Sequence, residues 1–81
     1  MTLVEARIGK RVETLRKSKK VLVNNRLKYL SVDDLSKIIY IDIDSYDDRV
    51  KGHIPFSIKS LLTIANLYEV DANYLIFGGI K

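Results

Sequence analysis

The chain of 81 residues contains no cysteine, no tryptophan and no glutamine, and it has a single proline and a single histidine. Without cysteine it forms neither a disulfide nor a thiolate metal site, which suits a reducing compartment. The single histidine, His53, excludes a zinc site with several histidines and a His–His proton relay. Apolar runs are only a few residues long, so we expect no membrane-spanning helix, no signal peptide and a cytoplasmic location.

The length and composition predict one small folded domain over residues 1–81. Domains usually contain roughly 50–250 residues. The hydrophobic fraction of 47% is too high for a disordered chain. The sequence also has no internal repeat, no low-complexity stretch and no Pro/Gly/Ser-rich linker in which a domain boundary could fall.

The net charge of +4 is unevenly distributed along the chain. Residues 1–30 carry nine Lys or Arg and two Glu, a net charge of +7. Residues 31–50 carry two basic residues and six Asp, a net charge of −4. Residues 51–81 carry three Lys against two acidic residues, a net charge of +1. The basic N-terminal third hints at a polyanionic partner, and the acidic middle weakens that hint.

Residues 4–19 have the spacing of an amphipathic helix. Its apolar stripe consists of Val4, Ile8, Val12 and Leu15. Gly9 lies inside this helix, where glycine costs up to about 1 kcal/mol relative to alanine. Residues 20–30 are ambiguous, because Val21–Val23 favour a strand whereas Asn24 and Asn25 favour a turn or a helix cap.

A second short helix is predicted at about Val32–Tyr40. Ser31 is its N-cap and Asp34 the weak capping-box partner. Its apolar face consists of Leu35, Ile38 and Ile39.

Two interpretations remain open for the segment after this helix. Residues 39–44 alternate apolar and polar side chains from Ile41 onward, which is the period of a strand. Alternatively, Asp42 is an N-cap and residues 43–51 form a helix that buries Tyr46 and Val50 and ends at Gly52.

The last third predicts two helices separated by a turn at Glu69 and Val70. Pro55 interrupts the chain and Ser57 caps a helix whose apolar residues are Ile58, Leu61, Leu62, Ile64, Ala65, Leu67 and Tyr68. Asp71 caps a short final helix that Gly78 and Gly79 close. The predicted fold class is therefore all-α, a compact bundle of four to five short helices.

Three segments together resemble the Xre family, the Cro/lambda-repressor type of helix-turn-helix domain. IGKRVETLRKSKK resembles its first helix, LSVDDLSKIIYIDIDSYDDRVKG fits its helix-turn-helix, and IPFSIKSLLTIANLYEVDANYLIFGG resembles its last two helices. The resemblance covers residues 8–79 except for an insertion of about ten residues between the first two helices. It favours the helix at residues 43–51.

The chain departs from the family pattern in the turn and in the reading residues. The tight turn usually contains glycine but here has Tyr40, which is strained if the position is left-handed. The family often has glutamine at the start of both helices, where this chain has Val32 and either Ile43 or Asp44.

The resemblance implies a sequence-specific DNA-binding transcriptional regulator that reads the major groove of operator DNA with its third helix. The groove-facing candidates are Ile43, Asp44, Ser45, Asp47, Asp48 and Arg49, and the loop candidates near the DNA backbone are Lys51 and His53. The candidates for phosphate contacts are Lys10, Arg11, Lys20 and Arg26. Each of these basic residues also suits a plain solvated exterior.

The acidic third helix leaves three interpretations open. Its aspartates stabilise the positive N-terminal end of the helix, or Ser45, Arg49 and one aspartate read bases, or the helix meets a basic protein surface. The last alternative describes a protein–protein interaction module that keeps the helix-turn-helix scaffold. No histidine pair, metal cluster or nucleophile accompanies the carboxylates, so we expect no enzyme, no metal and no cofactor.

The C-terminal end has more apolar side chains than one short helix buries. They are Tyr74, Leu75, Ile76, Phe77 and Ile80. They form either part of the core or a homodimer contact, since repressor-type domains commonly pair across a two-fold axis to match palindromic half-sites.

Overall fold

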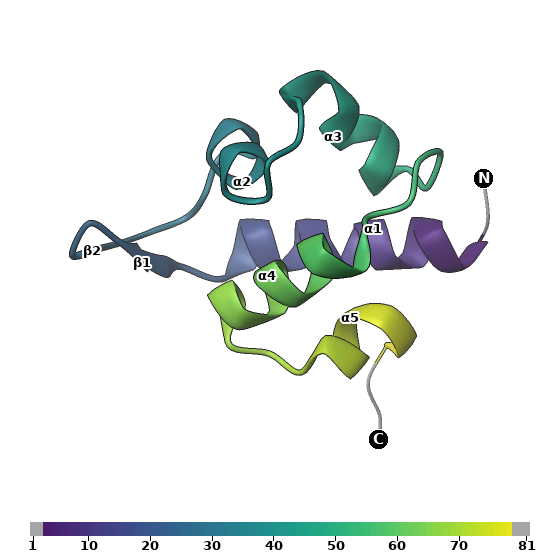
Figure 1. The fold of residues 1–81 in the computed structure, drawn as a ribbon. Helices are drawn as coiled ribbons and strands as arrows, with labels where there is room; N and C mark the ends of the chain where they lie inside the picture. The colour runs from purple at the N-terminus through teal and green to yellow at the C-terminus, as the bar shows by residue number, and fades with distance from the viewer. Residues whose placement is uncertain (1–2, 79–81) are drawn as a thin grey trace.

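A computed structural model of the chain describes residues 3–78 (Figure 1). The first helix, α1 (Leu3–Ser18), runs through the middle of the molecule. On one side of it lie α2 (Val32–Ile38) and α3 (Ile43–Val50), and on the other side lie α4 (Ile58–Tyr68) and α5 (Ala72–Phe77). None of the described helices is long and apolar enough to cross a membrane.

The segment between α1 and α2 is a β-hairpin, so the all-α prediction is corrected to five helices with one small sheet. Strands β1 (Val21–Val23) and β2 (Arg26–Lys28) pair antiparallel and project beyond the helices (Figure 1). Asn24 and Asn25 form the two-residue turn with φ of 52° and 65°. Such a turn needs positive φ at both central residues, which asparagine tolerates better than most residues.

The capping residues predicted for α2, α4 and α5 are confirmed. Ser31 accepts from the backbone N–H of Asp34 at 3.0 Å, and the Asp34 carboxylate accepts from the Ser31 N–H at 3.3 Å, which completes the capping box. Ser57 caps α4, and Asp71 caps α5. Gly78 ends α5 with a φ of 91°, a conformation that glycine adopts readily. The predicted partner of Gly78, Gly79, lies outside the described residues.

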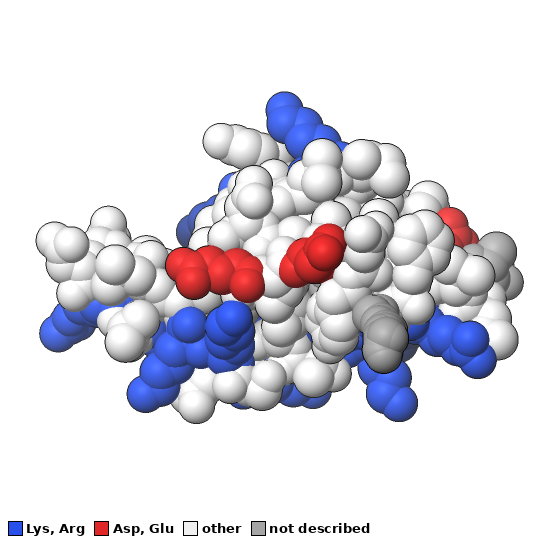
Figure 2. Space-filling view, turned by 90° about the horizontal axis from the view of Figure 1, so that it is seen from below, with Lys and Arg blue, Asp and Glu red and all other residues white. Residues whose placement is uncertain are grey.

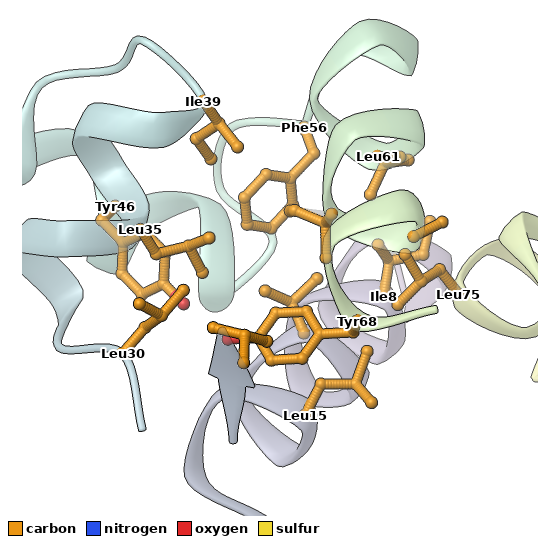
Figure 3. Packing of buried hydrophobic residues seen from close by; sticks show 14 residues of the cluster. Ile8, Leu15, Leu30, Leu35, Ile39, Tyr46, Phe56, Leu61, Tyr68 and Leu75 are labelled. Carbon is orange, nitrogen blue, oxygen red and sulfur yellow. The ribbon is translucent and has the colours of Figure 1, made fainter. Parts of the chain in front are cut away.

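The core is one cluster between α1 and the other helices. Tyr46 of α3 and Phe56 of the α3–α4 loop meet edge to face with ring centroids 6.3 Å apart, and Leu35 lies close by (Figure 3). Such an aromatic pair contributes about 0.5–1.5 kcal/mol beyond its buried area. Tyr68 and Leu75 join α4 and α5 to the same cluster. Residues 43–50 form helix α3 and bury Tyr46 as the helical interpretation predicted, so the strand interpretation of residues 39–44 is wrong.

Three positions of the predicted apolar stripes are exposed instead. Val4 is 58% exposed, Ile58 is 64% exposed and Leu62 is 50% exposed. On α4 the buried positions are Leu61, Ile64, Ala65 and Tyr68, spaced as i, i+3, i+4 and i+7. The predicted stripe was too wide because a short helix contacts its neighbours along one side only.

Candidate nucleic-acid interface

Helices α2 and α3 form a helix-turn-helix whose turn contains a strained residue. Tyr40 has a φ of 60°, the left-handed conformation that the sequence predicted to be difficult for a residue other than glycine. The Ile41 N–H donates to the carbonyl of Ser36 at 3.0 Å, which fixes the chain reversal after α2. The Tyr40 side chain is 89% exposed, so this tyrosine stands on the surface at the turn.

α3 is held on α1 by a polar network at one edge of the core. The Tyr46 hydroxyl donates to Glu13 Oε2 at 2.5 Å. Arg16 donates to both Glu13 oxygens, from Nε at 2.8 Å and from Nη2 at 2.9 Å, and its Nη1 donates to the Leu30 carbonyl at 3.1 Å. The Arg16 hydrogen bond lowers the pKa of Glu13 despite its partial burial, and burial together with the Glu13 carboxylate raises the pKa of Tyr46.

The close approach of α3 to α1 depends on Gly9. A Cβ on this residue would collide with the backbone carbonyl of Val50 at the end of α3. The sequence indicated only the helix-propensity cost of this glycine. The structure shows that it allows the two helix backbones to meet.

With Tyr46 facing inward, the outward side of α3 is acidic. Ile43, Asp44, Asp47 and Asp48 are exposed, while Ser45 and Arg49 are half-buried. Asp42 is at the N-cap as predicted, but its side chain makes no capping hydrogen bond within the described part of the chain. Asp42 and Asp44 therefore lie at the positive end of α3, where their charge is favourable without a direct hydrogen bond.

Two of the aspartates pair with the two loop residues expected at the DNA backbone. Lys51 Nζ lies 2.8 Å from Asp47 Oδ2, and this contact raises the pKa of Lys51. His53 Nδ1 lies 3.6 Å from Asp48 Oδ1, and the His53 N–H donates to the Asp48 carbonyl at 2.9 Å. All four side chains are at least half exposed, so these pairs separate at little cost. The loop thus places one cation, Lys51, and one imidazole, His53, beside the acidic helix.

Ser45 and Arg49 line an open pocket at the start of the helix. The pocket holds about 600 Å³ and is bounded by Tyr40, Ile41, Asp42, Ser45, Arg49 and Ile54. Ser45 Oγ donates to the Asp42 carbonyl at 2.9 Å, so its proton is used within the first turn. Arg49 Nη1 is buried and has no hydrogen-bond partner among residues 3–78. A buried guanidinium nitrogen without a partner is stabilised when a ligand supplies a hydrogen-bond acceptor.

The four candidates for phosphate contacts do not form one cluster. Arg11 Nη1 donates to the carbonyl of Leu75 at 2.7 Å, so part of this guanidinium already has a partner near the C-terminal end of α5. Lys10 is exposed on α1, and Arg26 is exposed on β2. The Lys20 ammonium lies 5.3 Å from the ring centroid of Tyr29.

Basic side chains are prominent on the side of the molecule away from α2 and α3. Figure 2 looks at the molecule from the side of α4 and α5, and there Lys and Arg side chains gather along one edge. The helix expected to read DNA lies on the far side of that view.

A groove beside the turn was missed by the sequence reasoning. It holds about 490 Å³ between the end of α2 and the start of α4, and its lining residues are Ile38, Ile39, Tyr40, Ser57, Lys59, Ser60 and Thr63. The predicted cap at Ser57 was the available signal, because a helix N-terminus attracts anions. Residues 3–78 bring together no group of His, Cys, Asp and Glu that could hold a metal.

The described architecture matches solved structures of helix-turn-helix regulators. The P22 c2 repressor protein, solved in complex with a synthetic operator, is 15% identical over 89% of this chain and 96% of its own, with a TM-score of 0.67. The restriction-modification controller protein C.AhdI from Aeromonas hydrophila is 20% identical over 86% of this chain and 92% of its own, with a TM-score of 0.64.

A third match is ClgR from C. glutamicum, the clp gene regulator, at 11% identity over 93% of this chain and 86% of its own, with a TM-score of 0.68. No protein-family model and no curated protein sequence matches the chain. At these identities the matches establish the fold. The chain has the repressor-type helix-turn-helix fold that the sequence resemblance implied.

Proposed function

We propose that this chain, which has the fold of the repressor-type helix-turn-helix proteins, is a single-domain, sequence-specific DNA-binding transcriptional regulator over residues 1–81. The observation that carries this proposal is the α2–turn–α3 unit, whose second helix exposes one whole face. The solved neighbour bound to an operator supports it, since it shares the arrangement over most of both chains. Its neighbours are regulators, which favours a regulatory role over an enzymatic one.

The proposed reading surface is the exposed side of α3 with the loop behind it. Ile43, Asp44, Ser45, Asp47, Asp48 and Arg49 face the bases, and Lys51 and His53 contact the backbone. An aspartate can accept from cytosine N4, and apolar Ile43 can contact a thymine methyl group. When DNA binds, phosphate oxygens replace the carboxylates of Asp47 and Asp48 as the partners of Lys51 and His53. Lys10, Lys20 and Arg26 add positive charge, whereas part of the Arg11 guanidinium already has a partner in α5.

The test is selection from a randomised duplex library at low salt, followed by titration of the enriched duplex at increasing salt. We expect an enriched sequence and an observed binding constant that falls steeply with salt, because cation–phosphate contacts release counterions. Absence of any affinity above background at low salt would overturn the proposal.

The acidic face of α3 supports a second function, a protein-interaction module that meets a basic protein surface. The discriminating variant is Asp47→Lys with Asp48→Lys. If the aspartates face a protein, this variant gains nonspecific DNA affinity and loses the partner. If they read DNA, it loses discrimination between the selected duplex and a scrambled one.

The matched control is Glu69→Lys, which reverses an exposed charge at the C-terminal end of α4. It should leave both readouts unchanged. Circular dichroism of each variant identifies a loss of helix, which would mean that the aspartates mainly stabilise α3.

A further inference from the structure

The β1–β2 hairpin has an exposed apolar face. Leu22 and Leu27 are directly opposite each other in the strand register, and their exposed fractions are 65% and 67%. Tyr29 follows two residues after Leu27, on the same side of the ribbon because side chains alternate, and it is 53% exposed. Small domains seldom leave contiguous apolar side chains uncovered on a projecting element unless a partner covers them.

The same hairpin is basic and contains no acidic residue. Residues 19–28 include four Lys or Arg. Two of them have local roles, since Lys19 Nζ donates to the Tyr68 carbonyl and Lys28 Nζ lies 3.2 Å from Asp34 Oδ2. The Arg26 side chain forms no hydrogen bond or ion pair with any described residue, and the Lys20 ammonium contacts only the Tyr29 ring. This charge favours a polyanion and opposes pairing with the same hairpin of a second copy.

The hairpin has a fixed direction relative to the helix pair. Val21 is only 5% exposed, and Val23 packs against the core, so the base of β1 is anchored. The Lys28–Asp34 contact ties β2 to the first turn of α2. The ribbon projects from the end of the molecule where α2 begins (Figure 1).

We infer that this hairpin is a second DNA-contacting element, seated in a groove of the duplex that flanks the site contacted by α3. Leu22 and Leu27 lie against sugars and base edges, and Lys20 and Arg26 contact phosphates. A two-stranded ribbon fits the major groove, which is about 12 Å wide, and apolar side chains contact thymine methyl groups there. Strands of three residues span about 10 Å, which suits that width. The inference rests on the proposed function.

The experiment compares footprints of the whole protein on the selected duplex, extended on both sides. The charge variant is Lys20→Ser with Arg26→Ser, and the apolar variant is Leu22→Thr with Leu27→Thr, which places a β-branched residue, favourable in a strand, at both positions. We expect both variants to lose protection of the flank and about tenfold in affinity while keeping the central footprint. The charge variant alone should flatten the log–log salt slope by about 2, since each phosphate contact contributes about 0.9.

The matched controls remove similar side chains elsewhere. Lys17→Ser removes an exposed lysine of α1, and Leu62→Thr removes an exposed leucine of α4. Both should keep the complete footprint of the unchanged protein, and circular dichroism verifies that all four variants are folded.

The outcomes separate this inference from the proposed function. If the unchanged protein gives no footprint on any duplex, both fail. If it gives a footprint and the hairpin variants reproduce it with equal affinity and salt slope, only the hairpin inference is overturned. It is also overturned if the apolar variant changes the sedimentation of the free protein and leaves the footprint intact, because the hairpin then contacts protein.

Discussion

Glu13 is the residue on which the position of α3 most depends electrostatically. Its carboxylate accepts from Tyr46 of α3 and from Arg16, and Arg16 in turn donates to the Leu30 carbonyl just before α2. Two side chains of α1, Glu13 and Arg16, thereby connect α1 to the middle of α3 and to the residue just before α2. Hydrogen bonds to a charged group contribute about 1.5–3 kcal/mol each, more than a neutral pair.

This carboxylate predicts a pH dependence of stability. The pKa of Glu13 is lowered in the folded protein from its ordinary value of 4.5. A lowered folded pKa gives stability that is complete above pH 4.5 and is lost as the pH falls through the folded pKa. We expect Glu13→Gln to lower the free energy of unfolding by about 2 kcal/mol at pH 7, with a difference from the unchanged protein that shrinks as the pH falls below about 4.

Urea denaturation at a series of pH values measures this difference. Tyr46→Phe serves as the control, because it removes one hydrogen bond and keeps the Glu13–Arg16 ion pair. It should retain most of the pH dependence. A Glu13→Gln difference that stays constant from pH 7 to pH 3 would contradict the role given to the carboxylate.

At the scale of elements, the contact between α1 and α3 decides how the reading helix is presented. Gly9 allows the approach in the middle of α1, and Gly52 turns the chain after α3 with a φ of 85° against the backbone of Ala6. Both glycines allow α1 and α3 to approach each other. Gly9 does so because it has no side chain, and Gly52 does so for that reason and because it adopts a positive φ. A bulkier residue at either position moves α3 away from α1.

Gly9→Ala tests this contact. At an exposed helix position the change stabilises by about 1 kcal/mol, but here the added methyl group meets the Val50 carbonyl. We expect a net loss of about 1–3 kcal/mol in the free energy of unfolding, as in other overpacked sites. Thermal unfolding measures it.

Thr14→Ala is the control in the same helix, at an exposed position. It should change the stability by less than about 0.5 kcal/mol. If Gly9→Ala stabilised the protein, the close approach of the two helices would be refuted.

At the scale of the whole molecule, the end formed by α1 and α5 exposes apolar side chains. Phe77 is 77% exposed, and with Val4, Arg7, Arg11 and Ile76 it lines a pocket of about 220 Å³. Leu75 is buried and belongs to the core, so it is not part of the predicted homodimer contact, which is left with the residues around it. Ile80, also predicted there, lies outside the described residues. We propose that two copies pair here, which suits a palindromic operator.

Phe77→Ser is expected to weaken such a dimer by at least about a hundredfold. Burying one phenylalanine contributes about 1.5–3 kcal/mol, and a two-fold dimer buries two. Sedimentation velocity over a range of concentrations should show association of the unchanged protein and a monomer for the variant. Leu62→Ser, at another exposed apolar position, should behave as the unchanged protein. If the unchanged protein stays monomeric at every concentration, the dimer proposal is refuted.

The sequence by itself determined the local features. The caps Ser31, Ser57 and Asp71 and most of the buried positions of α1 and α4 follow from hydrogen-bonding chemistry and helical period, which act over a few residues. The exposure of Val4, Ile58 and Leu62 does not follow from them. The strain at Tyr40 was also predicted, because a left-handed residue is difficult whatever surrounds it. The family resemblance added the order of helices and the face of α3 expected to read DNA.

Only the tertiary structure decided which charged residues are free. Arg11, Arg16 and Lys19 resemble the other basic residues in sequence, yet they bond to Leu75, Glu13 and Tyr68, and most of these partners are far along the chain. By contrast, Asp47 and Asp48 pair with Lys51 and His53, which lie only four and five residues further along the chain. The tertiary structure also settled the hairpin and the role of Gly9, because long-range packing selects among conformations that local sequence leaves nearly equal in energy.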